Sequence, residues 1–212
     1  MNEEFKQLVS QVSDPLKRDH GFSGKGRTVI REDHLLRAVA FHPEKTAARG
    51  KYRFDVTLSL GLPGLSSVAA ARREWVVSAS LGKLYRLRYP GKGRFELAGD
   101  ESDIEVERAV TSLLSDVCSE FLLSVPGPEE LLELLRDKGE FKRLDLWPWN
   151  ELPRLELASV YCAYLGREEQ ANQLMEEAIQ CALDGGMDYA VGRVRANVEH
   201  ALTARRASGG TQ

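Results

Sequence analysis

The sequence predicts an α+β protein in which an N-terminal helix covers an antiparallel sheet and a C-terminal helical bundle follows. Near the N-terminus, apolar side chains recur with the period of a half-buried helix, at Phe5, Leu8, Val9, Val12 and Leu16. Residues 52–60 alternate strictly between two kinds of side chain, apolar and polar, which is the period of a strand with one solvated face. From residue 102 onward the apolar period is helical again. These three patterns together predict the fold class.

Short strands are expected between the first helix and residue 100. Apolar runs there are separated by turn formers, among them Pro43, Gly50 and the pair Pro63-Gly64. Connections this short favour antiparallel neighbours, because a parallel return needs a crossover of about a dozen residues or more. The expected strands are residues 28–31, 35–41, 52–60, 75–81, 84–88 and 94–97, and a turn of helix is expected at residues 68–71.

A long helix is expected to begin at Ser102. Ser102 and Glu105 have the spacing of a capping box, in which each side chain accepts a hydrogen bond from an otherwise unpaired amide of the first turn. The apolar face of this helix is expected to be Ile104, Val110, Leu113, Leu114, Val117 and Phe121. Residues 126–128, Pro-Gly-Pro, then end it and start a short helix through Leu135, which Gly139 closes as a left-handed cap.

The C-terminal part is expected to contain a helical hairpin and one further helix. The hairpin helices are residues 155–165 and 168–183, joined at Gly166, and the last helix runs from residue 187 to about residue 205. The hairpin resembles one tetratricopeptide unit, in which small side chains let two antiparallel helices approach closely. The residues similar to that spacing are Ala158, Gly166, Ala171, Met175 and Ala178. A second copy is absent from the sequence, so a single hairpin is predicted rather than a repeat array.

Composition and length indicate an ordinary globular protein, since the chain has 212 residues of which 42% are hydrophobic and 29% are charged. Residues 1–100 are expected to form the helix and sheet, residues 101–206 the helices packed on it in one cooperative unit, and residues 207–212 a disordered tail. The N-terminus lacks the pattern of a signal peptide, and no apolar run approaches the ~18 residues that span a bilayer. A cytoplasmic protein without membrane contact is therefore expected.

No motif in the sequence defines a reaction, so an enzymatic activity is neither predicted nor excluded. The odd number of cysteines and the absence of a Cys-x-x-Cys spacing indicate buried apolar thiols, at Cys118, Cys162 and Cys181. Metal-ligand spacing is also absent from the four histidines, His20, His34, His42 and His200. We predict no metal, cofactor or catalytic residue. If the protein is an enzyme, His34 and Asp55 are the strongest candidates for a catalytic role.

Charge is distributed unequally along the chain. Residues 1–100 carry 18 Lys and Arg against 11 Asp and Glu, a net charge of +7, whereas residues 101–212 carry 11 against 21, a net charge of −10. Two interpretations stay open. Either the two halves neutralise each other or are simply solvated, or they present two opposed surfaces, one for anions and one for a basic partner.

The acidic half is the expected site of a protein partner. Its candidate residues lie on the short helix near residue 130 and in the loop that follows, at Glu129, Glu130, Glu133, Asp137, Trp147 and Trp149. Like charges three and four residues apart on a helix repel each other, and a cationic partner relieves that cost. The two tryptophans either fill the junction of sheet and helices or form a hot spot for the partner. A non-catalytic protein-binding module is therefore indicated, for example an immunity-type inhibitor of a basic toxin or nuclease.

The alternative function is a nucleic-acid or phospholigand binder that uses a basic sheet face. Its candidate residues are Arg27, Arg31, Arg37, Arg53, Arg86 and Arg94. Two Gly-Lys-Gly-Arg turns, at residues 24–27 and 91–94, allow backbone amides to crowd an anion, although ordinary hairpin turns explain them as well. The strands lack the dense aromatic residues of a base-stacking platform and the whole chain is negative, so nucleic acid is the less favoured ligand.

A series of glycines, aromatic residues and apolar residues follows a distinctive order in the first half of the chain. The series comprises Phe5 with Leu8, Leu16-Lys17, Gly21-Phe22, Lys25-Gly26-Arg27, Phe41, Phe54 with Val56, Leu60-Gly61, Trp75 and Leu81-Gly82-Lys83-Leu84. This order resembles the uncharacterised bacterial domain-of-unknown-function family 4304, and the helices from Ile104 onward are also similar to it. The resemblance implies an α+β fold over most of the chain. The family has no assigned activity, so the resemblance implies no site residue.

Overall fold

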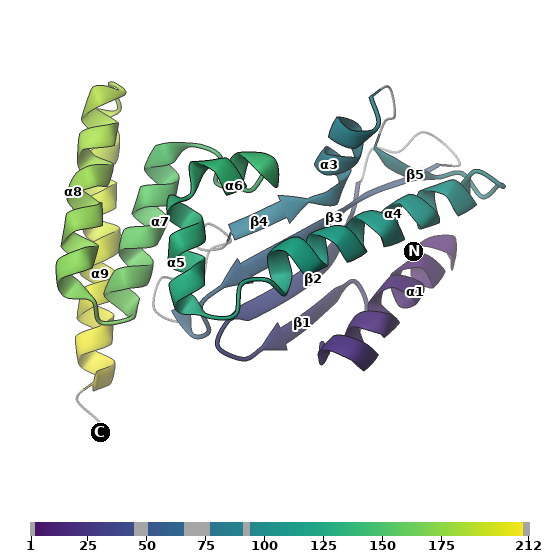
Figure 1. Cartoon of the computed structure of the whole chain (residues 1–212), viewed down its shortest axis with the longest axis horizontal. Coiled ribbons are helices and arrows are strands. Elements are labelled where there is room, and N and C mark those ends of the chain that lie inside the picture. The colour runs from purple at the N-terminus through teal and green to yellow at the C-terminus, as the bar shows by residue number, and fades with distance from the viewer. Residues whose placement is uncertain (1–2, 45–50, 66–76, 91–93, 210–212) are drawn as a thin grey trace. The chain divides into compact units, whose positions relative to one another are not determined.

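The computed structural model describes residues 3–44, 51–65, 77–90 and 94–209 (Figure 1). The chain divides into two compact units. Met1–Leu60 and Ser78–Pro126 form the first, called the sheet unit, and Gly61–Val77 and Gly127–Gln212 form the second, called the helical unit. Residues 101–126 therefore group with the sheet, although the sequence placed them with the later helices.

The sheet unit contains the N-terminal helix, the five strands and the helices α3 and α4. In chain order its elements are α1 (Glu3–His20), β1 (Thr28–Glu32), β2 (Leu36–Pro43), β3 (Tyr52–Gly61), β4 (Val77–Ser80), α3 (Leu81–Arg88), β5 (Phe95–Leu97), α4 (Asp103–Val117) and a π-helical turn, η2 (Cys118–Leu122). The predicted α+β class is confirmed. The expected helical turn at residues 68–71, the start of the strand expected at residue 75 and most of the turn at residues 91–94 lie outside the described residues.

The strands form one sheet in the order β1-β2-β3-β4, and β5 pairs with the first residues of β3. β1 and β2 are antiparallel, with Arg31 opposite Arg37, and β3 and β5 are antiparallel, with Arg53 opposite Glu96. The alternation predicted for residues 52–60 is confirmed, because the side chains at even positions from Phe54 to Leu60 are fully buried. The side chains between them, from Arg53 to Ser59, are half-buried on the other face.

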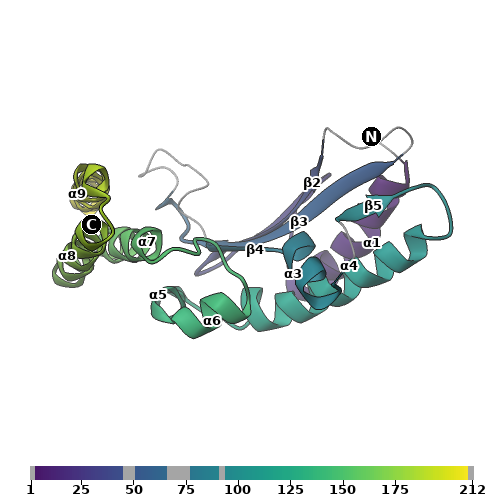
Figure 2. The same cartoon turned by 90° about the horizontal axis from the view of Figure 1, so that it is seen from above.

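Helices α1 and α4 both lie on the same face of the sheet (Figure 2). The whole apolar stripe predicted for α1 is buried, and Phe5 contacts the rings of Phe41, Tyr52 and Phe54 at centroid distances of 6.5, 4.7 and 5.2 Å. Helix α4 contacts α3 and β5. The hydrophobic core of this unit therefore lies between the sheet and these two helices.

The strand expected at residues 84–88 is wrong, because these residues belong to helix α3. Asp55 on β3 accepts hydrogen bonds from Gly82 N at 2.8 Å and Ser80 Oγ at 2.7 Å, and Ser80 Oγ accepts one from Lys83 N at 3.1 Å. The first turn of α3 is thus capped twice, locally by Ser80 and from β3 by Asp55, which precedes Gly82 by 27 residues. A short apolar run alone cannot distinguish helix from strand, and here the Ser80 cap and its support from Asp55 favour the helix.

The predicted capping box at the start of α4 is also wrong. Ser102 has helical backbone angles, φ −66° and ψ −20°, and its side chain makes no capping hydrogen bond. Asp103 instead orders the preceding loop by accepting hydrogen bonds from Ala98 N at 2.7 Å and Gly99 N at 3.1 Å. Ile104 is 52% exposed, because a spacing of six residues turns it away from the stripe that begins at Val110. The rest of the predicted apolar face is buried.

The helical unit consists of α5 (Pro128–Arg136), α6 (Lys138–Arg143), α7 (Glu151–Tyr164), α8 (Glu168–Asp184), a 3-10 turn, η3 (Asp188–Ala190), and α9 (Val191–Gly209). The predicted hairpin of α7 and α8 is confirmed, since the two helices contact each other and Gly166 adopts φ +80° between them. Gly139 does not cap α5: Asp137 ends that helix and begins α6 by accepting from Gly139 N and Glu140 N. Helix α9 continues to Gly209, so residues 207–209 of the expected tail are helical.

Gly82, at the second position of α3, provides a test of the Asp55 contact that caps this helix. A Cβ atom at Gly82 would lie 2.7 Å from Asp55 Oδ1, whereas a Cβ atom at Gly192, at the second position of α9, would meet nothing within 4 Å. We expect Gly82→Ala to lower the free energy of unfolding by about 1–3 kcal/mol, because the Asp55 carboxylate must leave its hydrogen bonds. Gly192→Ala should instead raise it by up to about 1 kcal/mol through helix propensity.

Denaturant unfolding followed by circular dichroism measures the free energy of unfolding of both variants. Equal effects of the two substitutions would contradict the capping role of Asp55.

Candidate functional site

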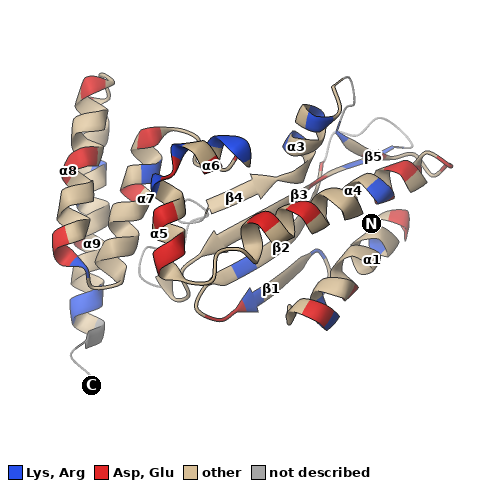
Figure 3. Cartoon of the chain, in the orientation of Figure 1, with Lys and Arg blue, Asp and Glu red and all other residues tan. Residues whose placement is uncertain are grey.

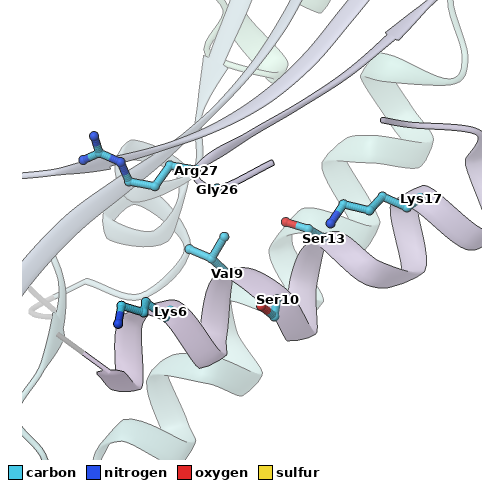
Figure 4. Close-up of a pocket in the computed structure, with 7 residues that line it drawn as sticks. All are labelled: Lys6, Val9, Ser10, Ser13, Lys17, Gly26 and Arg27. Atoms are coloured by element: carbon cyan, nitrogen blue, oxygen red, sulfur yellow. The ribbon is translucent and has the colours of Figure 1, made fainter. Parts of the chain in front are cut away.

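The sheet unit contains a pocket between α1 and the turn that precedes β1. Its volume is about 250 Å³ (Figure 4). It is lined by Lys6, Val9, Ser10, Ser13, Lys17, Gly26 and Arg27. Three of these seven side chains are cationic and two are hydroxyls, so the pocket offers hydrogen-bond donors and positive charge to a ligand.

The sequence of α1 places the polar lining on one stripe of the helix. Lys6, Ser10, Ser13 and Lys17 are spaced by four, three and four residues, which brings them onto one face beside the buried apolar stripe. Gly26 faces this stripe from the turn and adopts φ +71°, a conformation that favours glycine. The predicted Gly24–Arg27 turn thus becomes one wall of the pocket.

Ser13 is the most informative residue of the lining. It is 1% exposed, and its Oγ has no hydrogen-bond partner among the described residues. A buried hydroxyl without a partner costs about 1–3 kcal/mol, and most such groups in folded proteins are paired. An acceptor bound in the pocket would remove this cost.

The cations of the pocket are weakly held within the chain. Lys6 Nζ lies 2.7 Å from Glu3 Oε2 and Lys17 Nζ lies 3.3 Å from Asp14 Oδ1, both at the exposed surface. Surface ion pairs of this kind stabilise by only about 0–1 kcal/mol, so either lysine can turn to an anion at little cost. Arg27 has no ion-pair partner among the described residues. Figure 4 shows Arg27 and Lys6 toward one end of the pocket and Ser13 with Lys17 toward the other.

Arg27 is the one member of the predicted anion-binding set that lines this pocket. Arg37 is buried, and it donates to Leu122 O at 2.8 Å and Val125 O at 2.7 Å and pairs with Asp33. Its role is therefore structural, because its donors are satisfied by the end of the helix that covers the sheet.

The remaining arginines of that set do not share one sheet face. Arg31 is the cross-strand partner of Arg37, so the two lie on the same covered side, while Arg53 lies on the opposite side. Carboxylates within the chain also engage three of them: Arg31 pairs with Asp33, Arg53 with Glu96 and Arg94 with Glu44. Arg86 lies on helix α3 rather than on a strand. The expected basic sheet face is therefore not assembled from these residues.

Asp33 is the carboxylate shared by Arg31 and Arg37. Burial acts to raise its pKa, but the hydrogen bonds from Leu35 N and Arg37, with the charges of Arg37 and Arg31, outweigh burial and hold the pKa below its ordinary value. The stabilisation is therefore complete above the unfolded-state pKa of about 4 and is lost as the pH falls through the lower folded-state pKa.

The predicted acidic residues of the helical unit are all exposed, but two of them have partners within the chain. Glu129 pairs with Arg167, and Asp137 caps α6. Glu130 and Glu133 have no ion-pair partner among the described residues. In the following loop Trp147 is half-buried, whereas Trp149 is 58% exposed and donates from Nε1 to Asp145 O at 3.4 Å.

The charge contrast between the two halves of the sequence largely disappears when the chain is divided into its structural units. The sheet unit carries 17 Lys and Arg against 16 Asp and Glu, a net charge of +1, and the helical unit carries 12 against 16, a net charge of −4. Helix α4 is responsible, because its acidic residues belong with the basic strands (Figure 3). This division favours mutual neutralisation within the sheet unit over a strongly basic surface.

The strongest enzymatic candidates from the sequence do not form a site. Asp55 caps α3, and His34 is exposed in the loop between β1 and β2. Within the described ranges, no group of three or more His, Cys, Asp and Glu side chains is arranged to hold a metal ion. Burial raises the pKa of the Cys118 and Cys162 thiols to about 11, which keeps both thiols protonated near neutral pH.

A scan against protein-family models, a search of curated proteins and a search of solved structures each found no match to the chain. The resemblance to domain-of-unknown-function family 4304 therefore stays a hypothesis. None of the helices in the described part of the chain has the length and apolar character needed to cross a membrane.

Thiol labelling tests the burial of Cys118 and Cys162. At pH 8 we expect Cys118 and Cys162 of the folded protein to react with an aromatic disulfide reagent on the order of a hundredfold more slowly than in concentrated guanidinium, because the thiolate fraction is small. Peptide mass spectrometry distinguishes them from the half-buried Cys181. Rapid labelling of either residue in the folded protein would contradict its raised pKa.

Proposed function

We propose that this protein is a binding module that holds a small phosphate-bearing ligand in the pocket between α1 and Arg27. The observation that carries the proposal is the buried, unpartnered hydroxyl of Ser13 in a pocket lined by three cations. A phosphate oxygen accepts a hydrogen bond from the hydroxyl and takes the charge of a lysine, so one group satisfies both.

The length of the pocket favours a ligand larger than a single phosphate. Lys6 and Lys17 are eleven residues apart on α1, which places their Cα atoms roughly 16 Å apart along the helix axis. One phosphate can therefore lie between Ser13 and Lys17, while the rest of the ligand extends past Val9 toward Lys6 and Arg27. Nucleic acid is less favoured than a small ligand, because four of the five other predicted arginines are paired with carboxylates.

Inorganic pyrophosphate is a suitable probe for this site. Isothermal titration calorimetry of the full chain should show saturable binding. Ser13→Ala should lower the affinity about 10- to 100-fold, since one hydrogen bond to a charged acceptor is lost. Lys17→Gln should lower it similarly. Ser13→Ala should also leave the unfolding midpoint of the free protein unchanged or raised, because it removes an unsatisfied buried hydroxyl.

The matched control is Lys25→Gln, which removes an exposed cation two residues from Arg27 that does not line the pocket. Equal weakening by Lys25→Gln and Lys17→Gln would indicate general attraction of anions to the surface and would reject the pocket.

A second proposal is that α5 binds a basic protein, as an immunity-type inhibitor binds a toxin or nuclease. It is supported by Glu130 and Glu133, which are exposed one helical turn apart without an ion-pair partner among the described residues, and by the exposed indole of Trp149. Figure 3 displays the acidic residues of α5 along the helix. Such a surface raises the association rate of a cationic partner and is screened by salt.

Charge reversal on α5 tests this second proposal. Glu130→Lys combined with Glu133→Lys should leave the unfolding midpoint nearly unchanged, yet slow association with a basic partner at least tenfold at low salt and flatten its salt dependence. The partner is obtained by affinity capture from the native host, and association rates are measured by surface plasmon resonance. The control is Glu169→Lys with Glu176→Lys on α8, which makes the same change in net charge. If both double variants slow association equally, α5 is not the interface.

A further inference from the structure

Arg154 is a buried cation whose charge is poorly compensated within the chain. It lies in the first part of α7 and is 5% exposed. Its Nη1 donates to Leu135 O at a long 3.4 Å, and its guanidinium carbon lies 5.1 Å from the centroid of the Phe141 ring. Its Nε has no hydrogen-bond partner among the described residues.

Arg37, the other buried arginine in the described part of the chain, shows what full compensation requires. Arg37 is 3% exposed, and it donates to backbone carbonyls at 2.8 and 2.7 Å and is paired with Asp33. Buried guanidinium groups in folded proteins are normally paired in this way, because removal of a charge from water is costly. Arg154 has no carboxylate partner within the described ranges, so its environment there is incomplete.

A pocket of about 140 Å³ adjoins Arg154 in the helical unit. Arg136 and Lys138 contribute further positive charge to its lining, and Glu151 and Glu177 contribute carboxylates. Those carboxylates are engaged elsewhere, since Glu151 pairs with Lys138 and Glu177 accepts from Gln173 Nε2 at 3.2 Å. Neither carboxylate forms an ion pair with Arg154 among the described residues, so a counter-ion from outside the chain would complete its environment.

We propose that this pocket binds a small carboxylate, which accepts hydrogen bonds from Nε and a terminal nitrogen of Arg154. The planar guanidinium presents two parallel N–H groups that match the two oxygens of a carboxylate. A monoanion is favoured over a phosphate, because the nearby carboxylates of Glu151 and Glu177 repel a dianion more strongly. This site is independent of the phosphate pocket, since it lies in the other unit and uses none of the same residues.

Acetate is the probe for the test, with the full chain labelled with ¹⁵N. Sodium acetate replaces sodium chloride at constant ionic strength while the arginine Nε–H signals are recorded by nuclear magnetic resonance. The Arg154 signal, identified by its loss in Arg154→Lys, should shift along a saturable curve, because its Nε–H gains an acceptor. The signal of the exposed Arg195, which does not line the pocket, should stay in place.

Thermal unfolding provides a second readout with Arg154→Met and the control Arg195→Met. At acetate ten times its dissociation constant, the ratio of folded to unfolded wild-type protein should rise about 11-fold. Arg195→Met should keep this gain and Arg154→Met should lose it. A linear shift of the Arg154 signal, or one no larger than that of Arg195, would overturn the proposal even if Arg154→Met proves too unstable to study.

Discussion

The buried guanidinium of Arg37 joins the sheet to the helix that covers it. It reaches from the inner side of β2 to the carbonyls of Leu122 and Val125, where α4 and its π-helical turn end. Those carbonyls would otherwise lack partners, and the guanidinium would otherwise be an unpaired buried charge. Asp33 completes the arrangement by bonding both Arg37 and Arg31. The position of α4 on the sheet, and so the closure of the core over Phe54 and its neighbours, depends on this network.

Some buried polar groups of the described chain have hydrogen-bond or ion-pair partners, and others lack them. Glu156 is 6% exposed and accepts from Arg193 Nη2 at 2.8 Å and Asn197 Nδ2 at 2.7 Å, so the charge between α7 and α9 is satisfied. Ser13 and Arg154 are buried to a similar degree without equivalent partners among the described residues. Both adjoin pockets, one suited to a phosphate and the other to a carboxylate. The contrast between satisfied and unsatisfied groups is thus the basis of both proposed ligand sites.

Surface charge takes on a different meaning once the units are known. The acidic residues of α4 belong to the same unit as the basic strands. The ion pair of Arg88 with Asp116, 2.7 Å apart, connects helices α3 and α4 within this unit. Charge summed along the sequence therefore overstated the contrast between surfaces. What persists is local: Lys6, Lys17 and Arg27 around one pocket, and Glu130 with Glu133 on α5. Local groups of this size suit a small ligand or a single protein contact better than a long nucleic acid.

The sequence by itself determined the elements whose periodicity is strong, because helices and strands that bury one face repeat at fixed intervals. The α1 stripe, the alternation of β3 and the hairpin of α7 and α8 belong to this group. Only tertiary structure supplied the hydrogen bonds of Asp55, on a distant strand, which reinforce the local Ser80 cap at the start of α3. It also decided which arginines are free to bind, since pairing with Asp33, Glu96 or Glu44 depends on neighbours brought together by folding. Unpaired atoms such as Ser13 Oγ and Arg154 Nε become visible only when every surrounding donor and acceptor has a position.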